Sequence, residues 1–391
     1  MRTTLDAFAP PTDYLPVSVI TGFLGSGKTT LLNRLLRHPD MQKSAVVVNE
    51  FGEVGIDNLL IESATEDVMI MDGGCVCCTI RGDLVETLAN LYEKRQNGEV
   101  TYFERVIIET TGLADPAPII HTLLDDETLK SKYHLDSVLS TVDCVYAQQQ
   151  FEEFYETVKQ AAVADRVILT KTDLVKPEVV EQVKLRLNTL NPGAMMLESV
   201  NGNVDVKQLF SAGLYNPTTK SLDVQQWLQA EAYHEPHTHH HEAHHDHGHH
   251  EHHHHHHEGQ QFDYSYHDQI RHDEYIQSFC LEYDKPLAWK TLNMWFQQLT
   301  ALRGKDLLRI KGLVYTEETE LPVVVQGVQH IFQPPTTLDK WPKPQPLTQI
   351  VFITRNIQKA VLEKMLDILV KSKTPAEACQ ATLVLMGYES A

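Results

Sequence analysis

Residues 22–29 are Gly22-Phe23-Leu24-Gly25-Ser26-Gly27-Lys28-Thr29, a stretch that satisfies the phosphate-loop pattern G-x-x-x-x-G-K-[ST]. The apolar run Val17–Ile20 before it predicts a strand, and Thr30–Arg37 after it predicts a helix, so the pattern has the flanking elements it needs. Glycines let successive backbone N–H groups turn toward a phosphate, and the start of the helix adds its positive end. The stretch therefore predicts binding of a nucleoside triphosphate; an ordinary glycine turn before a helix is the alternative.

Two side chains of this loop have distinct expected roles. Lys28 is predicted to reach the β- and γ-phosphates as a catalytic residue, and the hydroxyl of Thr29 is a candidate ligand of Mg²⁺. The loop positions expected to bind the nucleotide are Gly22, Gly25, Ser26, Gly27, Lys28, Thr29 and Thr30.

Between Val17 and about Leu209, short apolar runs alternate with helical stretches. Strands that are apolar on both faces and alternate with helices are typical of a mostly parallel sheet covered on both sides. We therefore predict an α/β P-loop NTPase domain with its ligand at the carboxyl ends of the strands. The further predicted strands are Ala45–Val48, Val68–Met71, Arg105–Ile108, Ser137–Val142, Arg166–Thr170 and Met195–Ser199, and the further predicted helices are Asp83–Gln96, Pro116–Leu129, Ala147–Ala161 and Glu178–Leu190.

The composition limits the classes of partner. The chain has 391 residues, of which 42% are hydrophobic, so it can build the cores of two or three domains. A formal net charge of −20 argues against a nucleic-acid partner, and no apolar run approaches the ~18 residues of a membrane span. Met1–Tyr14 lacks the basic head and apolar core of a signal peptide, so we expect a cytoplasmic protein whose six cysteines are thiols or metal ligands.

The chain is expected to have four parts: an N-terminal extension (1–14), the P-loop domain (15–215), a flexible His-rich linker (216–272) and a smaller α+β domain (273–391). The linker is predicted because His234–His257 holds 16 histidines among small and acidic residues, a composition that cannot bury a core. In the last part, the predicted strands are Tyr275–Tyr283, Leu307–Val314, Pro322–Val328 and Leu347–Ile353, and the predicted helices are Pro286–Leu302 and Ile357–Val370.

The apolar strand Arg105–Ile108 ends in Glu109 and is soon followed by Gly112. This is the layout of the second metal-positioning element of P-loop enzymes, with Glu109 in the place usually held by an aspartate. We expect Glu109 to hold Mg²⁺ directly or through water, and Gly112 to let the backbone approach the γ-phosphate. The alternative is a strand that merely ends in a carboxylate.

Base selection is predicted at Thr170-Lys171-Thr172-Asp173, at the end of a predicted strand. The Asp173 carboxylate can accept two hydrogen bonds from guanine, whereas adenine offers no such donor pair, and the Lys171 stem can lie against the base. GTP is therefore favoured over ATP. The usual GTPase pattern has asparagine where Thr170 stands, so one amide contact is missing.

The polar segment Asn49–Asp57 is predicted to order around the γ-phosphate. Its acidic residues are candidate metal contacts, Glu50 and Glu53 for Zn²⁺ or Co²⁺ and Asp57 for Mg²⁺. The alternative is a solvated acidic loop.

Three of the six cysteines, Cys75, Cys77 and Cys78, fall within four residues directly after two glycines. Thiolates at this density suit Zn²⁺ or another thiophilic ion, and three protein ligands leave one position open for a metal that arrives and leaves. The alternatives are small core residues or, less favourably, a strained vicinal disulfide. The remaining cysteines, which are isolated and expected in the core, are Cys144, Cys280 and Cys379.

Together these motifs resemble the CobW-type (cobalamin synthesis protein) family of metal-chaperone GTPases, relatives of the urease- and hydrogenase-maturation GTPases. The motifs of the first domain are TGFLGSGKTT at 21–30, NEFGEVGID at 49–57, GGCVCC at 73–78, ETTGLADP at 109–116 and TKTD at 170–173. The last part of the chain adds RIKGLV at 309–314 and VQGVQHIF at 325–332.

The resemblance implies slow GTP hydrolysis, Zn²⁺ or Co²⁺ held at the cysteine motif, and delivery of that metal to a client metalloprotein. It maps the family's strand-end glutamate onto Glu109, and its guanine-reading lysine and aspartate onto Lys171 and Asp173. Some relatives carry a further cysteine motif near the N-terminus that docks a client, but Met1–Tyr14 has no cysteine, so the client is not identified. A homo-oligomer is compatible with these features.

Two other functions stay open. The tract His234–His257 binds transition metals at least loosely, so the chain can be a metal store; otherwise the tract is a collector for the cysteine site or a solvated linker. The phosphate loop alone also fits an ATP-dependent kinase or transferase, although the sequence marks out no second-substrate site.

Overall fold

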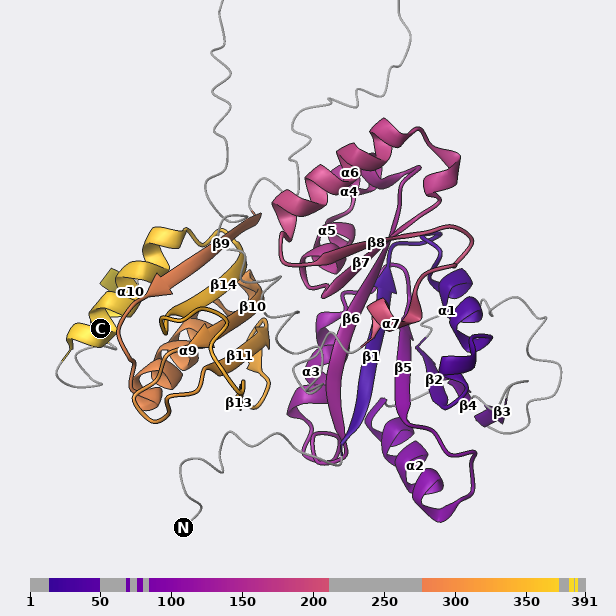
Figure 1. Ribbon diagram of the computed structural model, residues 1–391, viewed down its shortest axis with the longest axis horizontal. Helices are drawn as coiled ribbons and strands as arrows, with labels where there is room; N and C mark the ends of the chain where they lie inside the picture. The colour runs from indigo at the N-terminus through magenta and orange to yellow at the C-terminus, as the bar shows by residue number, and fades with distance from the viewer. Residues whose placement is uncertain are drawn as a thin grey trace, which may run out of the picture.

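Two domains lie side by side in the computed structural model (Figure 1). The structure describes residues 14–49, 68–70, 76–79, 84–210, 276–372, 380–382 and 384–385. The first domain, coloured indigo to pink, comes from the ranges up to residue 210, and the second, coloured orange to yellow, begins at residue 276.

The first domain is built on an eight-stranded sheet. Its strands are β1 (Leu15–Gly22), β2 (Ser44–Asn49), β3 (Val68–Ile70), β4 (Val76–Thr79), β5 (Arg105–Thr110), β6 (Tyr133–Asp143), β7 (Arg166–Thr170) and β8 (Met195–Ser199). They follow the order β3-β4-β2-β5-β1-β6-β7-β8, and every neighbouring pair is parallel except β3 and β4. The predicted α/β class with a mostly parallel sheet is confirmed.

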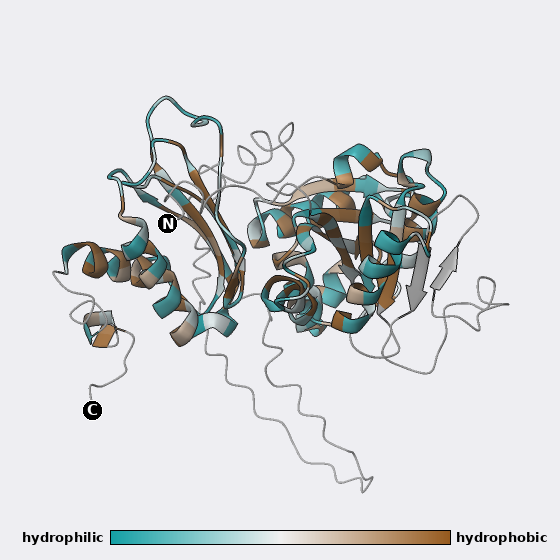
Figure 2. Cartoon of the chain, turned by 90° about the horizontal axis from the view of Figure 1, so that it is seen from below, coloured by the Kyte–Doolittle hydropathy of each residue, from teal (hydrophilic) through white to brown (hydrophobic). Residues whose placement is uncertain are grey.

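Helices cover both faces of this sheet, because successive side chains of a strand point to opposite sides. They are α1 (Lys28–Leu36), α2 (Leu84–Asn97), α3 (Ala117–Asp125), α4 (Ala147–Glu153), α5 (Tyr155–Ala162), α6 (Pro177–Leu190) and α7 (Val206–Leu209). Val17 and Val19 of β1 share a core with α2 and α3, whereas Ile20 packs with α1 in another. The central strands are accordingly brown, that is hydrophobic, in Figure 2.

The second domain carries an antiparallel sheet. Its strands are β9 (Ile276–Tyr283), β10 (Leu307–Val314), β11 (Val323–Val328), β12 (Ile331–Phe332), β13 (Thr336–Thr337) and β14 (Thr348–Arg355), and its helices are α9 (Trp289–Arg303) and α10 (Lys359–Lys371). The order is β12-β11-β10-β14-β9, with β13 beside β11. Both helices pack on the sheet in one core that contains Trp295 and Phe352, so the predicted α+β architecture is confirmed. None of the helices in the described ranges is both long and apolar enough to span a bilayer.

The helix predicted over Ala147–Ala161 is two helices. Phe154 takes an extended conformation between α4 and α5, with φ −125° and ψ 110°. Its ring centre lies 4.5 Å from that of Phe23 in the phosphate loop. Because neither glycine nor proline marks this break, the sequence pattern did not predict it. The break allows Phe154 to make an aromatic contact with the phosphate loop.

Two further local predictions differ from the structure. The helix predicted over Pro116–Leu129 ends at Asp125, because the next side chain, Asp126, accepts hydrogen bonds from two backbone N–H groups that follow it. No strand was predicted within the cysteine motif, which lies between β3 and α2 as expected, but part of the motif forms strand β4, which pairs with β2.

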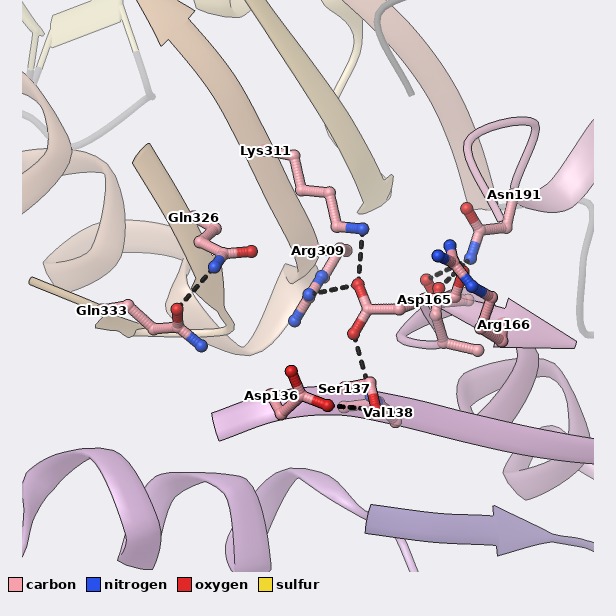
Figure 3. Close-up of polar contacts among 12 residues, drawn as sticks. Asp136, Ser137, Val138, Asp165, Arg166, Asn191, Arg309, Lys311, Gln326 and Gln333 are labelled. Carbon is pink, nitrogen blue, oxygen red and sulfur yellow. Dashed lines mark hydrogen bonds and ion pairs between the residues drawn. The ribbon is translucent and has the colours of Figure 1, made fainter. Parts of the chain in front are cut away.

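The two domains meet at a buried ion cluster, shown in Figure 3. The Asp165 carboxylate accepts a 2.7 Å hydrogen bond from Arg309 and lies 2.5 Å from the Lys311 ammonium, both on β10. Its other oxygen accepts a 2.9 Å hydrogen bond from the backbone N–H of Val138. Burial raises the pKa of the Asp165 carboxyl, but the charges of Arg309 and Lys311 outweigh this and hold the pKa at about 2. An ionised carboxylate therefore ties β10 to the first domain.

Helices α5 and α3 extend this interface. Leu308 of β10 and Ile353 of β14 belong to the same apolar core as α5. On α3, Nε2 of His121 lies 3.2 Å from the carbonyl oxygen of Val328. Two helices of the first domain, α3 and α5, thus contact the second domain.

Candidate nucleotide-binding site

The phosphate loop connects β1, near the centre of the sheet, to α1 (Figure 1). Gly22, Gly25 and Gly27 have φ angles of 140°, 72° and 93°. A β-carbon on Gly22 would lie 2.5 Å from the carbonyl oxygen of Thr141, so this position accepts only glycine. The glycine pattern of the sequence corresponds to a real backbone requirement.

Lys28 lies folded back over this loop. Its ammonium donates to the carbonyl oxygens of Gly22 at 2.8 Å and Phe23 at 3.0 Å. Burial lowers the pKa of Lys28, and the Glu109 carboxylate partly offsets that effect. Phosphate oxygens bind an ammonium more strongly than neutral carbonyls do, so a triphosphate can replace these two partners.

Thr29 and Glu109 meet beside the loop, and their oxygens fit a magnesium ion. Oγ1 of Thr29 donates a 2.9 Å hydrogen bond to Oε1 of Glu109, which is buried at the end of β5. A hydroxyl and a carboxylate side by side are the oxygen ligands that Mg²⁺ prefers. Thr30 follows on α1 and is exposed.

Gly112 lies directly against the phosphate loop. A β-carbon on Gly112 would lie 2.6 Å from the backbone nitrogen of Leu24, a distance that only glycine avoids. From the other side, the Gln160 amide of α5 donates to the carbonyl oxygens of Gly112 at 3.2 Å and Ala114 at 3.0 Å. The loop after β5 is therefore held between the phosphate loop and α5.

The residues expected to read the base lie at the carboxyl end of β7. Oγ1 of Thr170 donates a 2.8 Å hydrogen bond to the carbonyl oxygen of Ser26. Lys171 has φ 56°, and its ammonium pairs at 2.6 Å with Asp143, whose side chain is 1% exposed. Asp173 is exposed in the 3₁₀ turn that follows. The hydroxyl found in place of the usual asparagine thus connects the base-reading segment to the phosphate loop.

Sequence reasoning missed Thr141, Asp143 and Gln160. Thr141 shares a 2.6 Å hydrogen bond with the hydroxyl of Ser26, and Asp143 pairs with Lys171. Both lie at the carboxyl end of β6, so their place at the binding edge of a parallel sheet was the available signal. Gln160 lies inside a helix and outside every motif, so nothing in the sequence distinguished it.

Of the expected transition-metal site, the structure describes only the backbone of Cys77 and Cys78. They lie in β4, where they pair with Val46 and Val47 of β2. Within the described ranges, no group of three or more His, Cys, Asp or Glu residues is arranged to hold a metal ion. The other candidates, which lie outside the described residues together with the His-rich tract, are Cys75, Glu50, Glu53 and Asp57.

Cys144 and Cys280 are buried free thiols. Burial raises the pKa of Cys144 to about 11 and that of Cys280 to about 12. Thiols that stay protonated suit a core, as the sequence predicted, better than they suit a metal site. Cys379 lies outside the described residues.

Comparison with known proteins gives the family. Residues 16–198 match the CobW/HypB/UreG nucleotide-binding domain, and residues 276–370 match the cobalamin synthesis protein cobW C-terminal domain. The zinc chaperone YjiA of Escherichia coli (strain K12) is 30% identical over 340 residues, which cover 87% of this chain and 93% of YjiA. The chain belongs to the CobW family. The resemblance predicted from the sequence motifs is thereby confirmed.

Two further comparisons show how much of this CobW-family chain resembles known proteins. The zinc-regulated GTPase metalloprotein activator 1 of Saccharomyces cerevisiae is 26% identical over 389 residues, covering 90% of this chain and 82% of that relative. The crystal structure of Zn(II)-bound YjiA GTPase from E. coli matches with a TM-score of 0.64 and 28% identity, covering 90% of this chain and 98% of that one. The likeness therefore spans both domains.

Proposed function

We propose that this chain is a GTP-hydrolysing metallochaperone that binds Zn²⁺, or Co²⁺, at its cysteine motif and delivers the ion to a client metalloprotein. The observation that carries the nucleotide half is the folded-back Lys28 beside the hydrogen-bonded Thr29 and Glu109. The metal half is supported by the relatives, of which one is named a zinc chaperone and another a zinc-regulated GTPase.

The protein is a GTPase of the CobW family. Lys28 brings a buried positive charge to the β- and γ-phosphates, and Gly112 lets the backbone approach the γ-phosphate. Thr29 and Glu109 would hold Mg²⁺, which supplies positive charge that stabilises the transferring phosphoryl group. Catalysis of this kind depends mainly on positioning and charge.

GTP is the proposed substrate, rather than ATP, because the base-reading segment is supported from two sides. Asp143 holds the Lys171 ammonium, and the hydroxyl of Thr170 is bonded to the phosphate loop. Asp173 remains exposed and therefore accessible to the guanine edge. A carboxylate at this place rejects adenine because it would be left without its donor pair.

We propose that metal binding and nucleotide state both affect the part of the sheet formed by β4, β2 and β5. Strand β4, which carries Cys77 and Cys78, pairs with β2, and β2 pairs with β5 up to Glu109 and Thr110. Strand β2 ends at Asn49, where the acidic segment begins. GTP would order that segment and shape the cysteine site, and hydrolysis would release the ion.

The proposed setting is the reducing cytoplasm, because thiolate ligands must remain unoxidised. The partners are GTP or GDP, a transition-metal ion and a client metalloprotein. A homo-oligomer is compatible with the proposal.

The test is a metal titration against a competing chelator, run once with a GTP analogue and once with GDP. We expect one tight site whose affinity differs between the two nucleotides and is lost in Cys77→Ala. Cys144→Ala, a buried cysteine on the other side of the sheet centre, is the matched control and should keep the site. Equal affinity in both nucleotide states would contradict the carrier mechanism.

Deletion of His234–His257 distinguishes the metal-carrier function from a metal-store function. A carrier keeps its single tight, nucleotide-sensitive site after the deletion. A store would lose most of its bound metal, because the sequence concentrates 16 histidines in this tract. Preference for ATP over GTP in a competition assay would instead favour a kinase or transferase.

A further inference from the structure

Helix α5 holds the loop that follows β5 through two adjacent side chains. Gln160 is 1% exposed, and its amide nitrogen donates to the carbonyl oxygens of Gly112 and Ala114. One residue earlier on the helix, Lys159 pairs with Asp115 at 2.8 Å. The loop therefore has both a hydrogen-bonded and an ionic connection to this one helix.

The start of α5 is also connected to the phosphate loop. Phe154, which directly precedes the helix, packs its ring 4.5 Å from that of Phe23. Gly112 in turn lies against the backbone of Leu24. The two backbone segments expected around the terminal phosphates thus contact each other and the same helix.

Other side chains of α5 face the second domain. Val158 and Ala161 share an apolar core with Leu308. The guanidinium of Arg355, at the end of β14, lies 5.4 Å from the centre of the Tyr155 ring. Close-packed interiors transmit strain, so a shift of α5 would disturb this interface.

We propose that Gln160 is a positioning residue for GTP hydrolysis and that α5, through it, couples the loop at residues 112–115 to the docking of the second domain. One buried amide binds two carbonyl oxygens of that loop, those of Gly112 and Ala114, and so sets where the Gly112 backbone stands relative to the γ-phosphate. Oε1 of Gln160 has no hydrogen-bond partner in the described part of the chain, so both of its side-chain hydrogen bonds there go to this loop. The inference rests on the proposed GTPase mechanism.

Gln160→Met tests the positioning role, because it keeps the length of the side chain and removes the donor. We expect kcat for GTP to fall about tenfold, the equivalent of ~1.4 kcal/mol in the barrier, while the Kd of GDP, which lacks the γ-phosphate, stays within about twofold. Gln150→Met, a buried glutamine on α4, is the matched control and should keep the wild-type kcat. An unchanged kcat in Gln160→Met, or an equal loss of GDP affinity, would overturn the assignment.

Arg355→Met tests the coupling, with Arg303→Met as its control. Both arginines bond to Asp306 at 2.9 Å, and Arg355 additionally faces Tyr155. We expect kcat to fall about threefold in Arg355→Met and to stay unchanged in Arg303→Met. The double variant Gln160→Met/Arg355→Met should be no slower than Gln160→Met alone, because both substitutions act through helix α5. Equal effects of the two arginine variants, or fully multiplicative effects in the double variant, would overturn the coupling.

The wild-type chain in the same assays separates this inference from the proposed function. If the wild-type protein hydrolyses GTP and Gln160→Met has the same kcat, only the positioning role is contradicted. A wild-type protein without GTP hydrolysis contradicts the mechanism itself, and the metal titration tests the chaperone half independently.

Discussion

Lys28 and Lys311 are both 8% exposed, yet their surroundings differ in kind. Burial lowers the pKa of each ammonium. Lys28 bonds to the neutral carbonyls of Gly22 and Phe23, whereas Lys311 touches the ionised carboxylate of Asp165. Lys28 begins α1 in the candidate nucleotide site, and Lys311 lies on β10 at the interface between the domains.

The nature of the partner, rather than the degree of burial, distinguishes the candidate ligand-binding lysine, Lys28, from the structural one, Lys311. The direct partners of the Lys28 ammonium are neutral carbonyls, and the Glu109 carboxylate offsets its burial only in part, so an anion can take the place of those carbonyls. Arg309 and Lys311 on β10 both contact the ionised carboxylate of Asp165, so they present no comparable opening for a ligand. A buried lysine with a lowered pKa is thus a functional candidate only where its partners are replaceable.

Asp165→Asn should have the largest effect on stability. The substitution removes the ionised carboxylate that contacts both buried cations, Arg309 and Lys311, so the free energy of unfolding should fall by ~3–5 kcal/mol. Urea unfolding of the full chain measures it. Lys311→Met is the matched control: it keeps the Asp165–Arg309 pair and should change stability by less than ~1 kcal/mol or increase it. A loss of the same size in both variants would contradict the comparison.

Lys28→Met should impair GTP hydrolysis without lowering stability, in contrast to Asp165→Asn. It removes the positive charge expected at the phosphates, so kcat/KM for GTP should fall by about 10²–10³-fold. The free energy of unfolding should stay equal or rise, because a buried charge without a direct ionic partner is lost. Steady-state hydrolysis and urea unfolding on the same preparation check both halves. A large loss of stability would show that Lys28 is structural as well.

Acid should weaken the interface in a defined pH range. The folded pKa of Asp165 is held at about 2, below the unfolded value of ~3.9, so its contribution is complete above about pH 4 and is lost as the pH falls toward about 2. The loss should be ~2–3 kcal/mol, measured by urea unfolding at each pH. The Asp165→Asn variant should lack this component. An equal acid dependence in both proteins would assign the effect to other carboxyl groups.

Asp143→Asn should have the smallest effect and should act on base choice. Without the negative charge, the Lys171 ammonium loses its 2.6 Å partner, so the preference for GTP over ATP should fall about tenfold while kcat for GTP changes little. Asp136→Asn, at the opposite end of the same strand, is the control and should keep the preference. Unchanged selectivity in Asp143→Asn would mean that the pair does not position Lys171 for the base.

Motifs with strict spacing could be located from the sequence, because their chemistry requires fixed residue types. Glycines at the phosphate loop, Glu109 at the end of an apolar strand and the segment Thr170–Asp173 all lie at the carboxyl edge of the parallel sheet. Strand–helix alternation predicted the fold because the buried strands are mostly apolar on both faces.

The remainder depended on tertiary contacts. Strand β4 has only four residues, and β2 supplies its pairing partner, so local pattern did not predict it. The break at Phe154 is stabilised by an aromatic ring 131 positions earlier in the chain, Phe23, rather than by a local turn signal. Asp165 and Arg309 are likewise far apart in sequence, so their pairing appears only once the domains are placed.

Ser26 fixes the distance between the phosphate loop and the ends of strands β6 and β7 in the candidate nucleotide site. Its carbonyl oxygen accepts the hydroxyl of Thr170 and its own hydroxyl is bonded to Thr141, so the cradle for the phosphates and the strands that present the base-reading residues cannot separate. A ligand that contacts both must therefore span the interval between them. We expect a nucleoside monophosphate, which carries a single phosphate, to contact the phosphate loop less completely than a triphosphate and to bind more weakly.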